Sequence, residues 1–97
     1  MDIVKEAMCG TLESNDLLVK VAPGEGGLEL VVESEVMRQF GARIRQVVEE
    51  TLGQMGVEAG LVIVVDKGAL DCAIRARVQA AVLRGAESPD LDWRTLS

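Results

Sequence analysis

The sequence contains no histidine and no tyrosine among its 97 residues. Histidine is the most frequent general base in enzymes, and tyrosine can replace it in some of them. Without histidine, the Ser-His-Asp and Cys-His arrangements of nucleophilic catalysis are excluded. Carboxylates are plentiful, but their spacing marks no two of them as an acid–base pair in a cleft. We therefore expect a chain that does not catalyse a reaction by itself.

Aromatic residues and cysteines are scarce as well. Phe40 and Trp93 are the only aromatic residues, so the core must be built from aliphatic side chains. Cys9 and Cys72 lie far apart in the sequence, which favours two buried, unreactive thiols over a metal site or a redox pair. The glycine-rich segment 23–27 joins two predicted strands and lacks the Gly-Lys-Ser/Thr ending of a nucleotide-binding loop.

Positive charge and long apolar runs are also limited. With 10 basic and 16 acidic residues the net charge is −6, so we expect neither nucleic acid nor an anionic membrane as a partner. The longest apolar run, Leu61 to Val65, is too short to span a bilayer, and no signal peptide is visible, so a cytoplasmic location is expected. An acidic surface suits repeated docking on basic protein surfaces, but it would also serve solubility alone.

Residue periodicity predicts one domain over residues 1–86. Alternation of apolar and polar residues predicts strands at 7–12, 17–22 and 28–33, and a β-branched run predicts a buried strand at 60–66. Apolar residues at steps of three and four predict a helix of about five turns. The predicted apolar stripe of that helix consists of Val36, Phe40, Ile44, Val47, Val48, Leu52 and Met55.

The segment that follows the last of these strands fits two structures. Residues 70–77 alternate as a strand would, while Leu70, Ile74, Val78 and Ala81 also fit a helix. A tight turn at 66–68 favours a hairpin, so we predict a strand to about Arg77 and a short helix at 78–84. The expected fold is α+β in two layers: a mostly antiparallel sheet in the order β-β-β-α-β-β-α, packed on one long helix plus a short C-terminal helix.

Residues 87–97 form an acidic tail without periodicity. The tail contains Trp93, which could anchor in a pocket of a partner. Folding back onto its own domain is an equally good interpretation.

Ser14 stands out among the four serines because it lies in a predicted tight loop. The segment 13–16, Glu-Ser-Asn-Asp, separates two apolar runs, and these residue types favour turns. Ser14 should therefore be exposed at the end of a hairpin. Its hydroxyl can form a phosphodiester and could hold a group made elsewhere, while the chemistry would belong to that group. The residues alone favour an ordinary turn serine.

Three segments resemble the acyl carrier (gamma) subunits of citrate lyase. They are Gly10–Asp16, Gln39–Gly41 with Ile44–Arg45, and Asp66–Cys72, in the same order and with similar gaps. The last run, Asp-Lys-Gly-Ala-Leu-Asp-Cys, is the most specific of them, and the likeness covers roughly residues 1–86. Ser14 falls in the loop where this family attaches its prosthetic group.

The resemblance implies a phosphodiester between Ser14 and triphosphoribosyl-dephospho-coenzyme A, installed by a prosthetic-group transferase. The thiol of that group would carry acetyl as a thioester. An alpha (acyl transferase) subunit would exchange acetyl for citryl, and a beta (citryl lyase) subunit would release oxaloacetate. Citrate would thus be cleaved to acetate and oxaloacetate. The alternatives are a carrier subunit of citramalate lyase or malonate decarboxylase, and an adaptor subunit that carries nothing.

Overall fold

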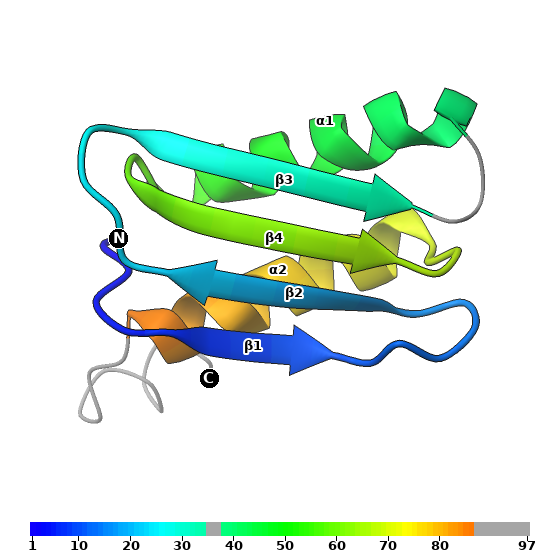
Figure 1. The fold of residues 1–97 in the computed structure, drawn as a ribbon, viewed down its shortest axis with the longest axis horizontal. Helices are drawn as coiled ribbons and strands as arrows, with labels where there is room; N and C mark the ends of the chain where they lie inside the picture. The colour runs from blue at the N-terminus through cyan, green and yellow to red at the C-terminus, as the bar shows by residue number, and fades with distance from the viewer. Residues whose placement is uncertain (35–37, 87–97) are drawn as a thin grey trace.

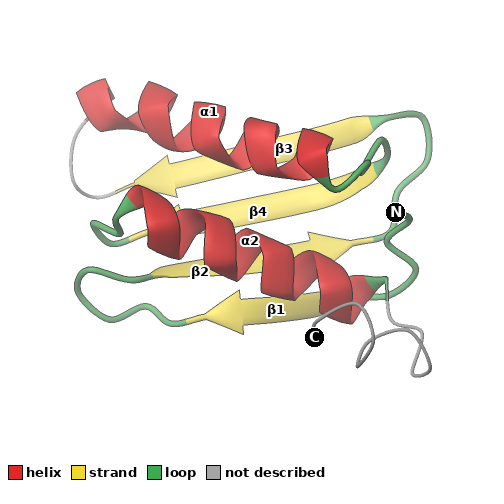
Figure 2. Cartoon of the chain, turned by 180° about the vertical axis from the view of Figure 1, so that it is seen from behind, coloured by secondary structure: helices red, strands yellow, loops and turns green. Residues whose placement is uncertain are grey.

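The computed structural model of the chain describes residues 1–34 and 38–86. Its elements are β1 (Ala7–Gly10), β2 (Leu17–Ala22), β3 (Leu28–Ser34), α1 (Arg38–Gln54), β4 (Gly60–Asp66) and α2 (Asp71–Gly85). The four strands of these described residues form one sheet, and both helices cover the same face of it (Figures 1 and 2). The predicted α+β fold in two layers is confirmed.

The order of strands across the sheet is β1-β2-β4-β3. The pairs β1–β2 and β2–β4 are antiparallel, whereas β3 and β4 are parallel. Parallel neighbours need a crossover connection, and α1 supplies it between β3 and β4. The sheet is therefore mostly antiparallel, as predicted, with one β-α-β unit at its edge.

The core lies between the sheet and the helices and is aliphatic, as the shortage of aromatic residues requires. In α1 the buried apolar residues follow the predicted stripe, and Thr51 is buried beside them. Met55 follows the last residue of α1 and is half-buried, while Val36 and the side chain of Phe40 lie outside the described part of the structure. The completely buried aliphatic side chains with the largest volumes are Leu17, Val19, Val47, Val48, Leu52, Val62, Val64, Ile74, Val78 and Val82. Cys9 is buried as expected, but Cys72 is exposed on α2, so that prediction was wrong.

The predicted strand at 70–77 and its hairpin are wrong, because these residues begin helix α2. Leu70 is 74% exposed, and the side chains buried by α2 repeat at steps of three and four from Ile74 to Val82. A hairpin partner was also impossible: β2 and β3 already occupy both edges of β4. The short helix predicted at 78–84 is the C-terminal half of α2.

Within the described residues, neither α1 nor α2 combines the length and apolar character that a membrane-spanning helix needs. The tail with Trp93 lies outside the described residues, so both interpretations of it stay open.

Candidate functional site: the Ser14 loop

Ser14 lies in the loop between β1 and β2, which extends beyond the sheet at the end opposite the N-terminus (Figure 1). Residues 11–15 are all exposed, so Ser14 is accessible to solvent. Its neighbour Asn15 has a φ of 66°, a left-handed conformation that asparagine tolerates better than most residues. The structure thus places Ser14 in an exposed turn, as the residue types of the loop predict.

The loop begins after Gly10, because β1 ends two residues earlier than predicted. Its base is narrow. The Thr11 amide donates a hydrogen bond to the Leu17 carbonyl at 3.1 Å, which closes the loop. Gly10 has a φ of 109°, and a Cβ at this position would overlap the Leu17 carbonyl oxygen. Only glycine allows the two strands to approach this closely at the start of the loop.

Asp16 joins the loop to helix α2. Its Oδ2 accepts hydrogen bonds from the Thr11 hydroxyl at 2.6 Å and from Arg77 Nη2 at 2.9 Å. Its Oδ1 accepts from the Leu17 amide at 2.8 Å and from Arg77 Nε at 3.1 Å. The Arg77 fork is therefore bidentate, a geometry that adds directional specificity to the charge attraction. One carboxylate thus connects both ends of the loop to a residue 61 positions away.

These donors also set the ionisation of the carboxylate. The hydrogen bond from Thr11 first, and then those from Arg77 and the Leu17 amide, lower the pKa of Asp16 from 3.8 to about 2. In return, the Asp16 carboxylate raises the pKa of Arg77 above its usual value. Both partners are therefore charged at neutral pH, where the connection between loop and helix is intact.

A second support comes from the turn that follows β4. The Asn15 amide donates to the Lys67 carbonyl at 2.8 Å, and the Lys67 amide donates to the Asp16 carbonyl at 2.9 Å. These bonds continue the β2–β4 ladder past its last pair, Leu17 and Asp66. The backbone on both sides of Asp16 is thereby tied to β4.

The turn is itself fixed by the buried carboxylate of Asp66. Asp66 is 1% exposed and accepts hydrogen bonds from the amides of Gly68 and Ala69, both at 3.0 Å. Ser34, the last residue of β3, donates its hydroxyl to the same carboxylate at 3.1 Å. The Asp-Lys-Gly-Ala segment thus builds the turn against which the Ser14 loop rests.

Sequence reasoning correctly placed Ser14 in an exposed loop but missed the side chains that hold this loop, namely Thr11, Asp16 and Arg77. Thr11 and Asp16 stand at the two ends of the loop, and this placement of two polar residues was the available local signal. Arg77 had no such signal, because residues 70–77 were assigned to a strand. The arrangement displays one hydroxyl to solvent on a loop that is tied to β4 and α2.

Comparisons with known proteins place the chain in a family. The family model described as "ACP: Malonate decarboxylase delta subunit (MdcD)" matches residues 4–85. The chain is 62% identical over 96 residues to the citrate lyase acyl carrier protein of Pectobacterium carotovorum subsp. carotovorum (strain PC1), with 99% of this chain and 100% of the relative covered. It is 61% identical over 97 residues to that of Enterobacter sp. (strain 638), with both chains fully covered.

A solved structure shares the fold. It is titled as a crystal structure of a Pseudomonas malonate decarboxylase hetero-tetramer in complex with malonate, and one of its chains matches with a TM-score of 0.74 at 24% identity, over 87% of each chain. At 24% identity, this match shows that the two chains share an architecture and shows nothing about function. The sequence matches establish the family, because they span the whole domain, including the loop and the turn that supports it. On these matches, the chain belongs to the family of citrate lyase acyl carrier proteins.

Proposed function

We propose that this chain is the acyl carrier subunit of a citrate lyase complex and that the Ser14 Oγ holds triphosphoribosyl-dephospho-coenzyme A as a phosphodiester. The observation that carries the proposal is the exposed Ser14 in a loop tied down on two sides, in a chain 62% identical to a citrate lyase acyl carrier protein. The chain is then a non-catalytic subunit of a lyase, working in the cytoplasm.

The residues around Ser14 fit such a group. Within residues 1–34 and 38–86, no hydrogen bond engages the Ser14 hydroxyl, and its neighbours Glu13 and Asn15 are exposed. A large substituent on Oγ can therefore project into solvent without displacing a core side chain. When bound, the group supplies a terminal thiol as the acyl-bearing atom.

The contribution of the protein itself is positional. Asp16 and Lys67 hold the backbone on the C-terminal side of Ser14, so a modifying enzyme meets one conformation of the loop. A loop fixed at its base also confines the tethered acyl group to a small volume around one end of the domain. Confinement raises the effective concentration of the group at an active site on a partner.

The partners in this proposal are the alpha (acyl transferase) and beta (citryl lyase) subunits and the prosthetic-group transferase. A second candidate is the carrier subunit of malonate decarboxylase, because the matching family model and the similar structure both bear that name. Identities of 61–62% to citrate lyase carriers over the whole chain favour the first candidate. Citramalate lyase is a variant of the same proposal that differs in substrate.

Mass spectrometry tests the attachment. The chain is produced together with its prosthetic-group transferase and the enzymes that make the group. The intact mass should exceed the sequence mass by one adduct, located on the peptide that contains Ser14. Ser14→Ala should lose the adduct and keep its fold, since surface substitutions usually change stability by less than about 0.5 kcal/mol. Ser88→Ala is the matched control and should keep the adduct. An unmodified wild-type chain under these conditions would sink the proposal.

Activity of the assembled complex tests the role. With the alpha and beta subunits, the modified chain should support cleavage of citrate, and Ser14→Ala should abolish it. Citramalate and malonate are assayed in parallel, because turnover of one of these in place of citrate would assign the chain to the corresponding alternative. Full citrate cleavage with Ser14→Ala would place the attachment site elsewhere.

A further inference from the structure

The sheet has a second face that the helices leave open. Both helices lie behind the sheet in Figure 1, and Figure 2 shows the covered side. The strand register defines which side chains lie on the open face, because neighbouring residues of a strand point to opposite sides. They form three rows across the strands: Ala22, Leu61, Glu29; Met8, Lys20, Ile63, Val31; and Gly10, Leu18, Val65, Glu33.

Apolar side chains dominate these rows. Met8 and Val31 are 53% and 40% exposed, and Leu18, Leu61, Ile63 and Val65 are half-buried by their neighbours alone. A shallow hollow of about 460 Å³ lies at the end of this face away from the Ser14 loop, over the start of β1, the end of β2 and the start of β4. Its lining includes Glu6, Met8, Lys20, Ala22, Leu61 and Ile63. The hollow is large enough to receive an aliphatic or aromatic side chain from another protein.

The size of the face limits what it can bind. Strands of about six residues are roughly 20 Å long, and four strands are roughly 19 Å wide, so the face measures about 400 Å². A stable protein interface buries about 800 Å² on each partner. The open face alone is thus too small for a permanent contact, and it suits a partner that docks and leaves.

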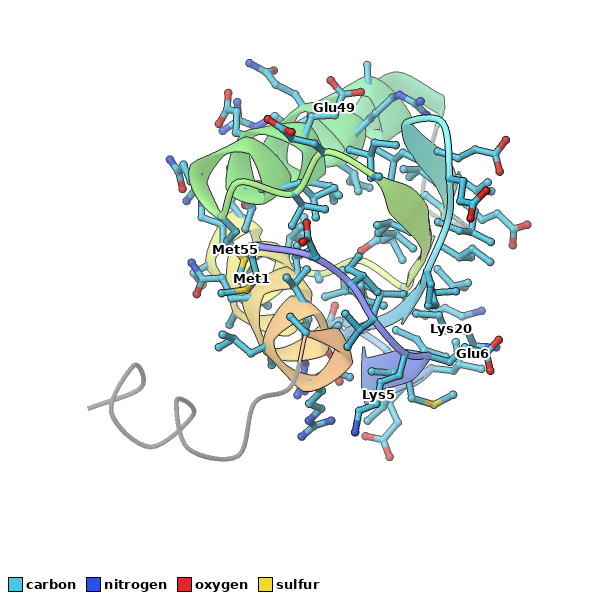
Figure 3. All side chains as sticks on the ribbon, turned by 90° about the vertical axis from the view of Figure 1, so that its left-hand side faces the viewer. Met1, Lys5, Glu6, Lys20, Glu49 and Met55 are labelled. Carbon is cyan, nitrogen blue, oxygen red and sulfur yellow. The ribbon has the colours of Figure 1, made fainter. Side chains whose placement is uncertain are left out.

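The charges on this face argue against a second copy of the chain. Glu29 and Glu33 lie along β3 and are exposed, and Glu6 lies beside the hollow, whereas Lys20 is the single cation in the rows. Figure 3 shows Glu6 and Lys20 together on the side away from the helices. Two copies packed face to face would bring six of these carboxylates together with only two lysines. The complementary surface is apolar with basic side chains opposite β3.

We propose that the open sheet face is the surface on which this carrier docks its catalytic partners, and that each partner presents an apolar patch bordered by Lys or Arg. This inference rests on the proposed function, which supplies the partners: the acyl transferase and citryl lyase subunits. The Ser14 loop continues from β1 and β2, which form half of the face, and it projects past the sheet (Figure 1). A partner seated on the face would therefore have the attachment site at its border.

Charge reversal on the face is the first test. The modified wild-type chain, Glu29→Lys/Glu33→Lys and the control Glu50→Lys/Glu58→Lys are each titrated against the purified alpha and beta subunits. Both double variants change the net charge equally; Glu50 is exposed on α1, which covers the other side of the sheet, and Glu58 is exposed in the loop between α1 and β4. The face variant should bind at least one subunit about tenfold more weakly and with a smaller salt dependence. The control should stay within about threefold of wild type.

A second pair of variants tests the apolar part. Val31→Lys places a charge within the middle row, and Val4→Lys makes the same change at a position that is 62% exposed outside the strands. Val31→Lys should weaken binding and Val4→Lys should not. Circular dichroism on all variants checks that the fold is retained, and sedimentation measures self-association. A wild-type dimer that Val31→Lys dissociates would overturn the inference by assigning the face to a second copy.

The two proposals fail in different ways. If the modified wild type binds neither catalytic subunit, both the proposed function and the docking inference are overturned. If the wild type carries its Ser14 adduct and binds, but both face variants bind as tightly as their controls, the docking inference alone is overturned. The adduct on the face variants confirms that the Ser14 loop itself was left intact.

Discussion

Replacing Gly10 by alanine should separate the two strands that carry the Ser14 loop. A Cβ at this position would overlap the Leu17 carbonyl oxygen and would lie 3.2 Å from the Leu18 Cα. These atoms belong to the backbone of β2, so no side chain can rotate away to make room. The strands must move apart, and the hydrogen bond from the Thr11 amide to the Leu17 carbonyl lies at the point of contact.

Gly27→Ala provides a matched control for this change. Gly10 and Gly27 both have positive φ, at 109° and 127°, but a Cβ on Gly27 would meet nothing within 4 Å. Backbone strain of about 1–3 kcal/mol is common to both variants. Alanine also stabilises both variants equally by lowering the conformational entropy of the unfolded chain. The comparison therefore isolates the collision.

The difference between the two variants follows from the contacts. Forcing an extra carbon into a filled space costs about 1–3 kcal/mol, and the lost hydrogen bond adds about 1 kcal/mol. Gly10→Ala should thus be about 2–4 kcal/mol less stable than Gly27→Ala. This difference is measured by urea unfolding followed by far-ultraviolet circular dichroism. The urea midpoint of Gly10→Ala should be lower than that of Gly27→Ala by about 1–2 M. Stabilities within about 0.5 kcal/mol of each other would refute the close approach of β1 and β2 at Gly10.

Three further changes test the loop and the core. The pKa of Asp16 lies at about 2 when folded, below its ordinary 3.8, so its charge stabilises the fold above about pH 4 and this contribution is lost as pH falls toward 2. The stability gap between wild type and Asp16→Asn should shrink over that range in urea titrations; a constant gap contradicts the ion pair. Ile44→Ala should cost about 2–5 kcal/mol in the same assay, and the exposed Leu70→Ala less than about 0.5. Asn15→Val should cost about 1–2 kcal/mol because of its left-handed backbone, whereas Asn15→Gly should be close to neutral.

Elements with a single consistent pattern were predictable from the sequence. The stripe through Ile44, Val47 and Leu52 specified α1, since these spacings suit a helix and no alternation competes with them. Strands β2, β3 and β4 were likewise defined within one residue by alternation or by β-branched residues. The order of the strands was not predictable, because it depends on β4 inserting between β2 and β3. No local pattern in the residues of β2 or β3 indicates that β4 lies between these strands.

Segment 70–77 shows where pattern reasoning fails. Polar residues at Asp71, Arg75 and Arg77 happen to alternate with apolar ones, so a period of two competes with a period of 3.6 over a short window. Alanines at 73, 76, 80 and 81 favour a helix, since alanine has the highest intrinsic helix propensity. Burial decides the outcome: a helix buries Ile74 and Val78 against the sheet, whereas β4 has no free edge for another strand.

The same correction changes the physical account of the site. In the predicted hairpin, Arg77 would end a strand and Ser14 would occupy an isolated turn. In the structure, α2 runs back beneath β1 and β2 (Figure 2), and this path brings the Arg77 guanidinium to within 2.9 Å of the Asp16 carboxylate. The Ser14 loop is therefore fixed by tertiary contacts to α2 and to the turn after β4, in addition to the hydrogen bonds among its own residues. The conformation that the chain presents at Ser14 consequently depends on the folding of the C-terminal half of the domain.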